Sequence, residues 1–143
     1  MAIRTYSPRQ MAVILGGVPI TGFAEDTFIN VSPSSETFTR SVGASGEVSR
    51  VEKADRTGNL ALTLQQTSPS NEYLTGLHLA DRQSLAGTFS LLIKDNNGNT
   101  VISAENAYIA RLPDAEYNQE VGTREWLIEF DDMFATYGSN NLS

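Results

Sequence analysis

The residues that most often carry out nucleophilic or acid–base chemistry are sparse in this sequence. His78 is the only histidine, and the chain contains no cysteine. A Ser-His-Asp triad would therefore have to use His78, yet no Gly-x-Ser-x-Gly elbow is present to expose a nucleophilic serine. A lone histidine between two leucines of a helical segment is more often structural than catalytic. We expect no triad hydrolase.

Paired carboxylates are a second arrangement with chemical potential. Glu125 and Glu129, or Asp131 and Asp132, have the residue types that supply the acid and the second carboxylate of a glycosidase. Glu125 and Glu129, however, fall on the polar face of an expected strand, where nothing indicates a pocket that encloses one carboxyl group. We interpret both pairs as part of a solvated acidic surface.

The oxygen-rich run from Asp95 to Asn99 has the residue types of a calcium loop. It lacks the glutamate at the twelfth position that completes an EF-hand loop, and a tight turn explains the same residues. Neither a phosphate-binding Gly-x-x-x-x-Gly-Lys loop nor a Gly-x-Gly-x-x-Gly fingerprint occurs. The sequence therefore predicts a protein that is not an enzyme, with no catalytic, cofactor-binding or metal-binding residues.

Composition limits the remaining classes of function. The chain has 143 residues, which suits one domain spanning 1–143, and its net charge is −7. Residues 105–143 hold eight acidic and two basic residues, so −6 of the −7 lies there. Tight nucleic-acid binding needs clustered Lys and Arg, which argues against DNA as a tightly held ligand. One side of the molecule is expected to be acidic.

Membrane insertion by this chain is not expected. No apolar run approaches the roughly 20 residues that span a bilayer, and the N-terminal residues lack the apolar region of a signal peptide. We expect a soluble protein that is made in the cytoplasm.

The clearest secondary structure in the sequence is a strand followed by a helix, and these two elements would position neighbouring residues. Leu60, Leu62 and Leu64 alternate with the period of two that gives a strand one apolar face. Ser68 is then expected at the N-cap of a helix with Pro69 in its first position. The apolar stripe of this helix comprises Tyr73, Leu74, Leu77 and Ala80.

Turn signals separate the other expected strands. Gly16-Gly17 predicts a hairpin between residues 11–15 and 18–20, and Asn97-Gly98 predicts one between residues 88–93 and 100–110. Residues 27–31 form a further strand, and residues 36–40 are expected to return to the sheet. A last strand at 123–130 turns Trp126 toward the core and Glu125 toward water. The fold class is therefore mainly β, a β-sandwich or barrel with one flanking α-helix.

Residues 40–58 do not fit this pattern, because they combine glycines with charges of both signs and have few apolar residues. Structureless loops longer than roughly 12 to 15 residues are uncommon in compact domains. Two interpretations stay open: a solvated flexible loop, or a long inter-subunit loop that orders against a neighbouring copy. Under the second, the interface residues are Arg40, Val42, Val48, Arg50, Val51, Lys53, Asp55 and Arg56.

The order and spacing of several segments resemble one family, the tail tube proteins of contractile-tailed bacteriophages. The resemblance covers nearly the whole chain, although none of its motifs is diagnostic by its chemistry alone. The matching residues are Tyr6-Ser7-Pro8, Val18-Pro19-Ile20, Gly43-Ala44-Ser45-Gly46-Glu47-Val48-Ser49-Arg50, Gln66-Thr67-Ser68-Pro69-Ser70-Asn71, Leu92-Ile93-Lys94-Asp95 with Gly98, and Arg124-Glu125-Trp126.

This resemblance implies a structural subunit of the virion tail, assembled in the host cytoplasm, with a fold shared with the tube protein of type VI secretion. Six copies would join into a hexameric ring, and stacked rings would form a hollow inner tube. Its partners would be further copies of itself and the tail sheath, baseplate and tail terminator proteins. DNA would pass through the tube only as non-specific cargo.

The hollow tube that the resemblance implies leads to one further expectation, and an alternative function stays open. Acidic strand faces that line a channel would repel phosphate, and Glu125 and Glu129 are the candidates for that lining. The alternative function is a non-catalytic β-sandwich binding module for carbohydrate or a receptor on a virion or cell surface. In that case Trp126 and the tyrosines would stack on sugars, whereas the place of Trp126 on the apolar strand face favours a core position.

Overall fold

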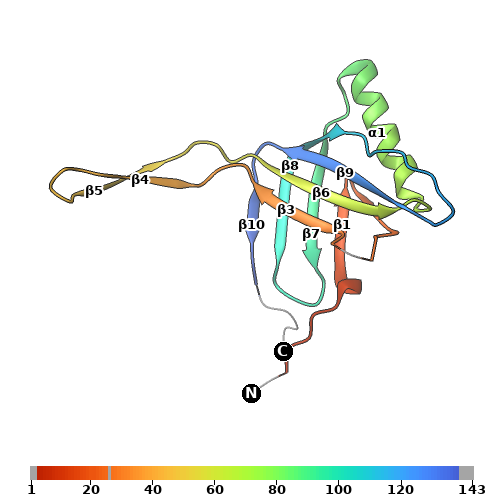
Figure 1. Ribbon diagram of the computed structural model, residues 1–143, viewed down its shortest axis with the longest axis horizontal. Coiled ribbons are helices and arrows are strands. Elements are labelled where there is room, and N and C mark those ends of the chain that lie inside the picture. The colour runs from red at the N-terminus through yellow and green to blue at the C-terminus, as the bar shows by residue number, and fades with distance from the viewer. Residues whose placement is uncertain (1–2, 26, 139–143) are drawn as a thin grey trace.

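The computed structural model describes residues 3–25 and 27–138, and its strands form one extended antiparallel sheet and one separate ribbon. Figure 1 shows their arrangement. The elements in chain order are η1 (Pro8–Gln10), β1 (Met11–Leu15), β2 (Val18–Pro19), β3 (Ile29–Pro33), β4 (Phe38–Val42), β5 (Val48–Glu52), β6 (Gly58–Gln65), α1 (Ser70–Ser84), β7 (Phe89–Asp95), β8 (Val101–Arg111), β9 (Thr123–Phe130) and β10 (Phe134–Thr136).

The long strand β8 divides the main sheet into two layers. The strand order is β2-β1-β7-β8-β9-β6-β3, and β10 also pairs with β8. The first residues of β8 pair with β10, from Val101 to Ser103, whereas its later residues pair with β9, from Ala107 to Arg111. Strands β3, β6 and β9 therefore lie across β1, β7 and β10 (Figure 1). The expected mainly-β, sandwich-like fold with one flanking helix is confirmed.

The core fills the space between these layers and follows the predicted alternation. Leu60, Leu62 and Leu64 are fully buried. The predicted apolar face of β9 is buried as well, and most of the remaining core side chains come from β1, β7 and β8, with Ile20 and, from α1, Leu74 completing the core cluster. Burial of one face per strand explains why the period of two was readable in the sequence for these elements.

Helix α1 packs on the flank of the two layers, as expected, but its start and its stripe differ in detail. It is assigned from Ser70, while Pro69 already has helical dihedral angles and Ser70 N donates a hydrogen bond to the Ser68 hydroxyl (3.2 Å). Leu74 is fully buried. Ala80, predicted to belong to the apolar stripe, is exposed instead, because the last turns of α1 extend beyond the sheet (Figure 1).

Two hydrogen bonds join α1 to the strands. The Tyr73 hydroxyl donates to Leu15 O (2.8 Å), and Trp126 Nε1 donates to Asn71 Oδ1 (3.0 Å). Because these contacts tie the first turns of the helix to β1 and β9, α1 closes one end of the space between the layers.

Both predicted hairpins are confirmed. Strands β1 and β2 pair around Gly16 and Gly17, whose φ angles are 60° and 83°. Glycine tolerates these positive φ angles, which are strained for other residues. Strands β7 and β8 pair as predicted, but the turn centres one residue earlier, on Asn96-Asn97, because Gly98 N donates to Asp95 O (3.2 Å).

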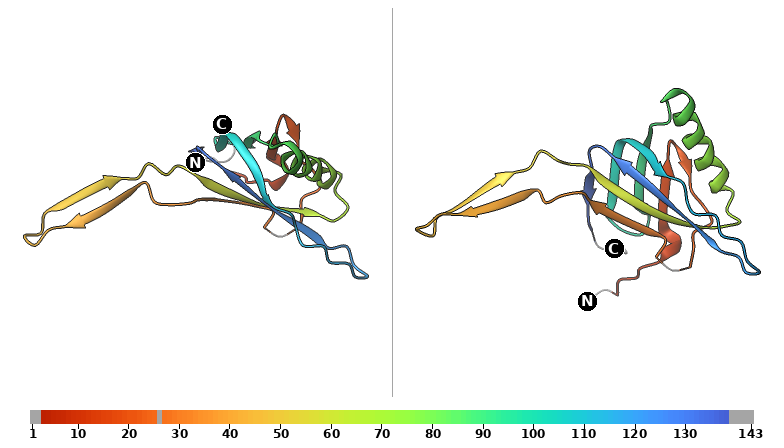
Figure 2. Two further views of the ribbon diagram at one scale, coloured as in Figure 1. Left: turned by 90° about the horizontal axis from the view of Figure 1, so that it is seen from above. Right: turned by 45° about the horizontal axis from the view of Figure 1, so that its top comes forward.

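Within residues 40–58 the structure has paired strands in place of the loop that both interpretations assumed, and the expected return of residues 36–40 to the main sheet is wrong. Strands β4 and β5 pair only with each other, in register from Phe38 opposite Glu52 to Val42 opposite Val48. Gly46, at φ 86°, permits the tight turn between them. Figure 2 shows that this β4–β5 ribbon projects far from the body along its longest direction.

Candidate assembly surfaces

The β4–β5 ribbon has two faces of different composition. Residues paired across an antiparallel ribbon share a face, so the register places Phe38, Arg40 and Val42 together, opposite Glu52, Arg50 and Val48. We call this set the arginine face. The other face carries mostly small polar side chains and Val51.

Apolar side chains on the arginine face lie in solvent. Val42 is 61% exposed and Val48 is 67% exposed, and these two face each other next to the turn. The guanidinium of Arg50 stacks on the Phe38 ring at 4.4 Å. Exposed apolar residues gathered on a projecting ribbon are typical of a surface that another molecule covers.

Two like charges also face each other on this ribbon. Arg40 and Arg50 are cross-strand partners, and neither forms an ion pair with the described residues. Like charges directly opposite each other destabilise an isolated strand pair. An acidic partner surface would remove this repulsion.

The base of the ribbon is held by hydrogen bonds rather than by a core. Asp55 accepts bonds from the Thr57 hydroxyl (2.6 Å), Thr57 N (3.0 Å) and the Ser35 hydroxyl (2.8 Å). These bonds, those of Thr57 first, lower the pKa of Asp55 from 3.8 to about 2, with a smaller contribution from the charge of Lys53. Asp55, which the sequence placed among interface residues, therefore has an internal role in the fold.

The remaining basic residues of the predicted interface also lie at the base. Arg56 lies 3.9 Å from Glu52 in an exposed ion pair, and Lys53 N donates to Thr37 O (2.8 Å). Both residues line an open hollow of about 330 Å³ between the ribbon and the body. Of the eight predicted residues, only Arg40, Val42, Val48 and Arg50 lie on the arginine face.

The two predicted channel-lining residues share an uncovered face of the sheet. Glu125 pairs with Thr63 and is exposed, while Glu129 pairs with Asn59 and is half-buried. The Tyr108 hydroxyl donates to Glu129 Oε2 (2.6 Å), and this bond raises the pKa of Tyr108. The alternation of side chains along the expected strand thus correctly placed both carboxylates on one face.

Nothing in the described residues forms a catalytic arrangement. His78 is half-buried, and its Nδ1 has no hydrogen-bond partner among the described residues, so no second group orients it as a base. No group of His, Asp and Glu side chains within 3–25 and 27–138 is placed to hold a metal ion. In the same ranges, no helix is both long and apolar enough to cross a membrane.

Comparison with known proteins identifies the family. Residues 18–138 match the family described as Bacteriophage PhiTE tail tube protein. The chain belongs to this phage tail tube family. It is also 35% identical over 144 residues to structural protein ORF10 of Pseudomonas phage KPP10, covering 95% of this chain and 83% of that protein. The predicted family resemblance is confirmed, and a structural role in the phage tail follows from it.

Solved structures with a similar fold include chains of contractile injection systems. The tube-terminating cap of the anti-feeding prophage aligns with a TM-score of 0.67 at 13% identity, covering 95% of this chain and 94% of that one. A chain of the sheath-tube complex of an extracellular contractile injection system in its extended state aligns with a TM-score of 0.65 at 14% identity, covering 92% and 91%. At this identity the likeness shows the fold alone.

For this tail tube protein, sequence reasoning missed one exposed surface opposite the ribbon. The segment between β8 and β9 exposes Leu112, Tyr117 and Val121, the last two at 76% and 66%. Its residues have no periodicity, and an excess of Asp and Glu is its only signal in the sequence. Phe38 lies just before residues 40–58, so the unusual composition of that segment does not mark it.

Trp126 does not support a sugar-binding role. It is 2% exposed and donates to Asn71, so its ring cannot stack on a ligand at the surface. The predicted core position of Trp126 is confirmed, so the binding-module alternative cannot use Trp126 and keeps only the exposed tyrosines.

Proposed function

We propose that this chain, acting as one domain over residues 1–143, is the repeating subunit of a phage tail tube. Copies join into hexameric rings, and stacked rings form a hollow inner tube through which DNA passes. The observation that carries this proposal is the β4–β5 ribbon, which projects into solvent with Val42 and Val48 more than half exposed. A protein that worked alone would have no use for this surface.

The edges of the main sheet support association through strands. The sheet ends at β2 on one side and at β3 on the other, and both edges leave backbone groups unpaired. Edge-to-edge pairing around a closed ring removes such edges. We therefore propose that neighbouring subunits in a ring join their sheets, with α1 on the flank or outer side.

The uncovered face that holds Glu125 and Glu129 is proposed to line the channel. Carboxylates there repel DNA phosphates, so DNA would slide without binding. In tubes that carry Glu125→Lys, we expect the rate of DNA release to fall at low salt and to return to the wild-type rate at high salt. Glu72→Lys, which lies on the helix, should leave the rate of DNA release unchanged. Equal release from both variants would refute this lining.

The partners proposed for the tube are the tail sheath, the baseplate and the tail terminator, and the protein would be located in the virion tail after assembly in the host cytoplasm. The related chains come from a sheath-tube complex, a tube-terminating cap and a sheath/tube terminator, which supports the sheath and the terminator as partners. Its role would be mechanical and not enzymatic.

Electron microscopy of the purified protein at rising concentration tests the proposal. Rings and hollow tubes are the expected result, and a protein that stays monomeric at every concentration and salt would refute it. A matched variant replaces residues 41–49 by Asn-Gly, which suits a two-residue turn between the paired Arg40 and Arg50. This variant should keep the monomer fold, seen by circular dichroism, and lose stacking.

A further inference from the structure

We propose that the arginine face of the ribbon docks onto the β8–β9 loop of a second copy of this chain. We define the β8–β9 loop as residues 112–122. This inference rests on the proposed tube function and names the surface that receives the ribbon. It assigns a binding role to residues that the sequence pattern left without one.

The two surfaces lie at opposite ends of the molecule. In Figures 1 and 2 the ribbon extends from one end of the longest axis, and the β8–β9 loop lies beside α1 at the other end. A contact between unlike surfaces is heterologous, so each copy that binds one neighbour still offers its free end to the next. Such a contact propagates into rings or helical stacks instead of stopping at a dimer.

A hollow beside the loop offers apolar walls to the apolar end of the ribbon. It has a volume of about 480 Å³, and it is lined by Leu112, Pro113, Ala115, Tyr117 and Trp126 together with the polar residues Gln66, Asn71, Thr75 and Arg124. The Arg124 guanidinium lies 5.1 Å from the Tyr117 ring centroid, which holds one wall in place. Val42 and Val48 are paired at the end of the ribbon and are small enough to enter together.

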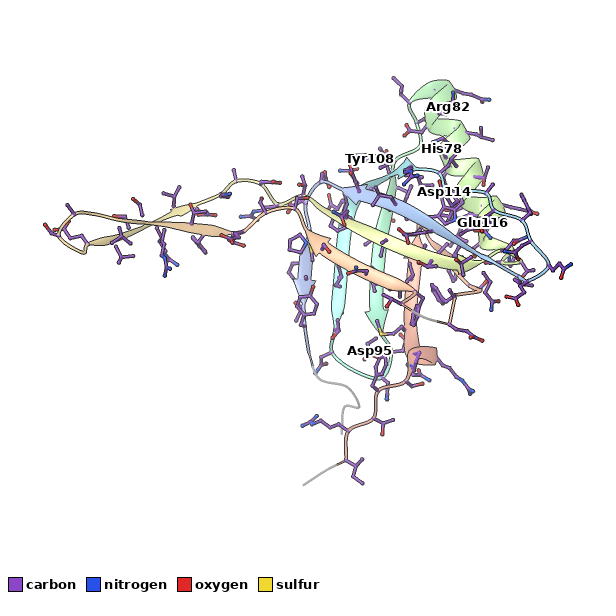
Figure 3. All side chains as sticks on the ribbon, in the orientation of Figure 1. His78, Arg82, Asp95, Tyr108, Asp114 and Glu116 are labelled. Carbon is purple, nitrogen blue, oxygen red and sulfur yellow. The ribbon has the colours of Figure 1, made fainter. Side chains whose placement is uncertain are left out.

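Charge complementarity matches the same two surfaces. The loop carries Asp114, Glu116 and Glu120 and no basic residue. Asp114 is paired with Arg111 (3.0 Å), whereas Glu116 and Glu120 form no ion pair with the described residues. Figure 3 labels Asp114 and Glu116 on the side of the body away from the ribbon. Two unpaired carboxylates in the loop thus correspond to the two unpaired guanidinium groups on the ribbon, Arg40 and Arg50.

A second acidic surface fits the ribbon less well. Glu105, Asp131 and Asp132 surround a hollow that Arg56 also lines, so this surface already lies beside the base of the ribbon of its own copy. The Asn106 side chain donates to Asp131 Oδ2 (3.1 Å), and Asp132 N donates to Asp131 Oδ1 (2.7 Å). These groups provide a matched control, because they are acidic and exposed but differently placed.

Cysteine trapping tests the contact directly, since the chain has no cysteine of its own. A Val48→Cys variant is mixed with a Tyr117→Cys variant under assembly conditions and then oxidised. We expect a covalent dimer that contains one copy of each variant. Val48→Cys mixed with Asp132→Cys is the control and should remain uncrosslinked.

A charge exchange gives an independent readout. Glu116→Lys with Glu120→Lys should raise the concentration needed for assembly at least tenfold, as should Arg40→Glu with Arg50→Glu. An equimolar mixture of the two double variants should restore assembly, because each can then pair with the other. Circular dichroism of each double variant is the check on folding, and we expect wild-type spectra because the substituted side chains are exposed.

The outcomes separate this inference from the function on which it rests. If wild-type protein never assembles, both fail. If wild-type tubes form but the control pair crosslinks and the Val48–Tyr117 pair does not, the docking surface is wrong and the tube function stands. If the loop variants build normal tubes that no longer bind purified sheath protein, the loop receives the sheath and not a second copy, which also overturns the inference.

Discussion

Replacing Val42 and Val48 together by serine should weaken assembly without affecting the monomer. Full burial of a valine side chain stabilises by about 1.5 kcal/mol. Val42 is 61% exposed and Val48 is 67% exposed, so each can still contribute about 1 kcal/mol when a neighbour covers it. Their joint loss of about 2 kcal/mol corresponds to about a 25-fold weaker contact, because 1.4 kcal/mol is a factor of ten.

The assay is the critical concentration for tube formation, measured by sedimentation and checked by electron microscopy. We expect it to rise about 25-fold in the double variant. Val51→Ser is the matched control, because Val51 is 58% exposed on the same ribbon but on its other face. A similar or larger rise for Val51→Ser, together with an unchanged value for the double variant, would refute the assignment of the arginine face.

Three further predictions concern stability. Asn71→Ala removes the acceptor of the buried Trp126 N–H and should lower the free energy of unfolding by about 1–3 kcal/mol. Urea titration followed by Trp fluorescence measures this change, and an unchanged unfolding midpoint would contradict the prediction. Gly22→Ala should destabilise the fold more than Gly17→Ala. Both glycines have φ near 80°, but only a Cβ at Gly22 would meet the Ser68 Cβ, at 2.5 Å. Equal unfolding midpoints of the two variants would argue against this contact. Asp55 has a lowered pKa, so the stability that it contributes is present above about pH 4 and is lost as the pH falls through about 2. Amide exchange at Thr57 should therefore become faster between these two pH values. The Asp55→Asn variant should not show this pH dependence.

Sequence patterns predicted the elements whose side chains divide between a buried and an exposed face. The alternation at Leu60, Leu62 and Leu64 correctly gave β6, and the parity of β9 placed Trp126 inside and Glu125 outside. The β7–β8 hairpin was predictable because Asn and Gly cluster between two apolar runs, although the turn itself centres on Asn96-Asn97. In each case a local rule and the tertiary burial agree.

The two strands of the ribbon could not be predicted from the sequence, for the opposite physical reason. Neither face of β4 or β5 packs on the body, so no hydrophobic period of two marks them, and Thr39, Ser41 and Ser49 resemble loop residues. The pairing register is also needed to separate Val51 from Val42 and Val48. The sequence therefore predicted a special segment at 40–58 but gave it the wrong conformation and mixed its two faces.

The β8–β9 loop could not be predicted as a docking surface, because irregular backbone has no period at all. Leu112, Tyr117 and Val121 are spaced without pattern, and all three are exposed. Leu112 and Tyr117 line one hollow only in the folded chain, where the segment lies beside α1 (Figure 1). Only the surplus of acidic residues there was visible in the sequence.

The energetics of the ribbon connect its form to its role. An isolated two-stranded ribbon is marginally stable in water, and the Arg40–Arg50 pair makes this one less stable than an average ribbon. The hydrogen bonds at Asp55 hold its base but do not reach its turn, so its outer half must gain most of its order from whatever covers it. If a second copy supplies that cover, amide protection of Val42 and Val48 should increase strongly in tubes. If protection in the monomer already equals that in the tube, the ribbon is preformed and its order does not depend on assembly.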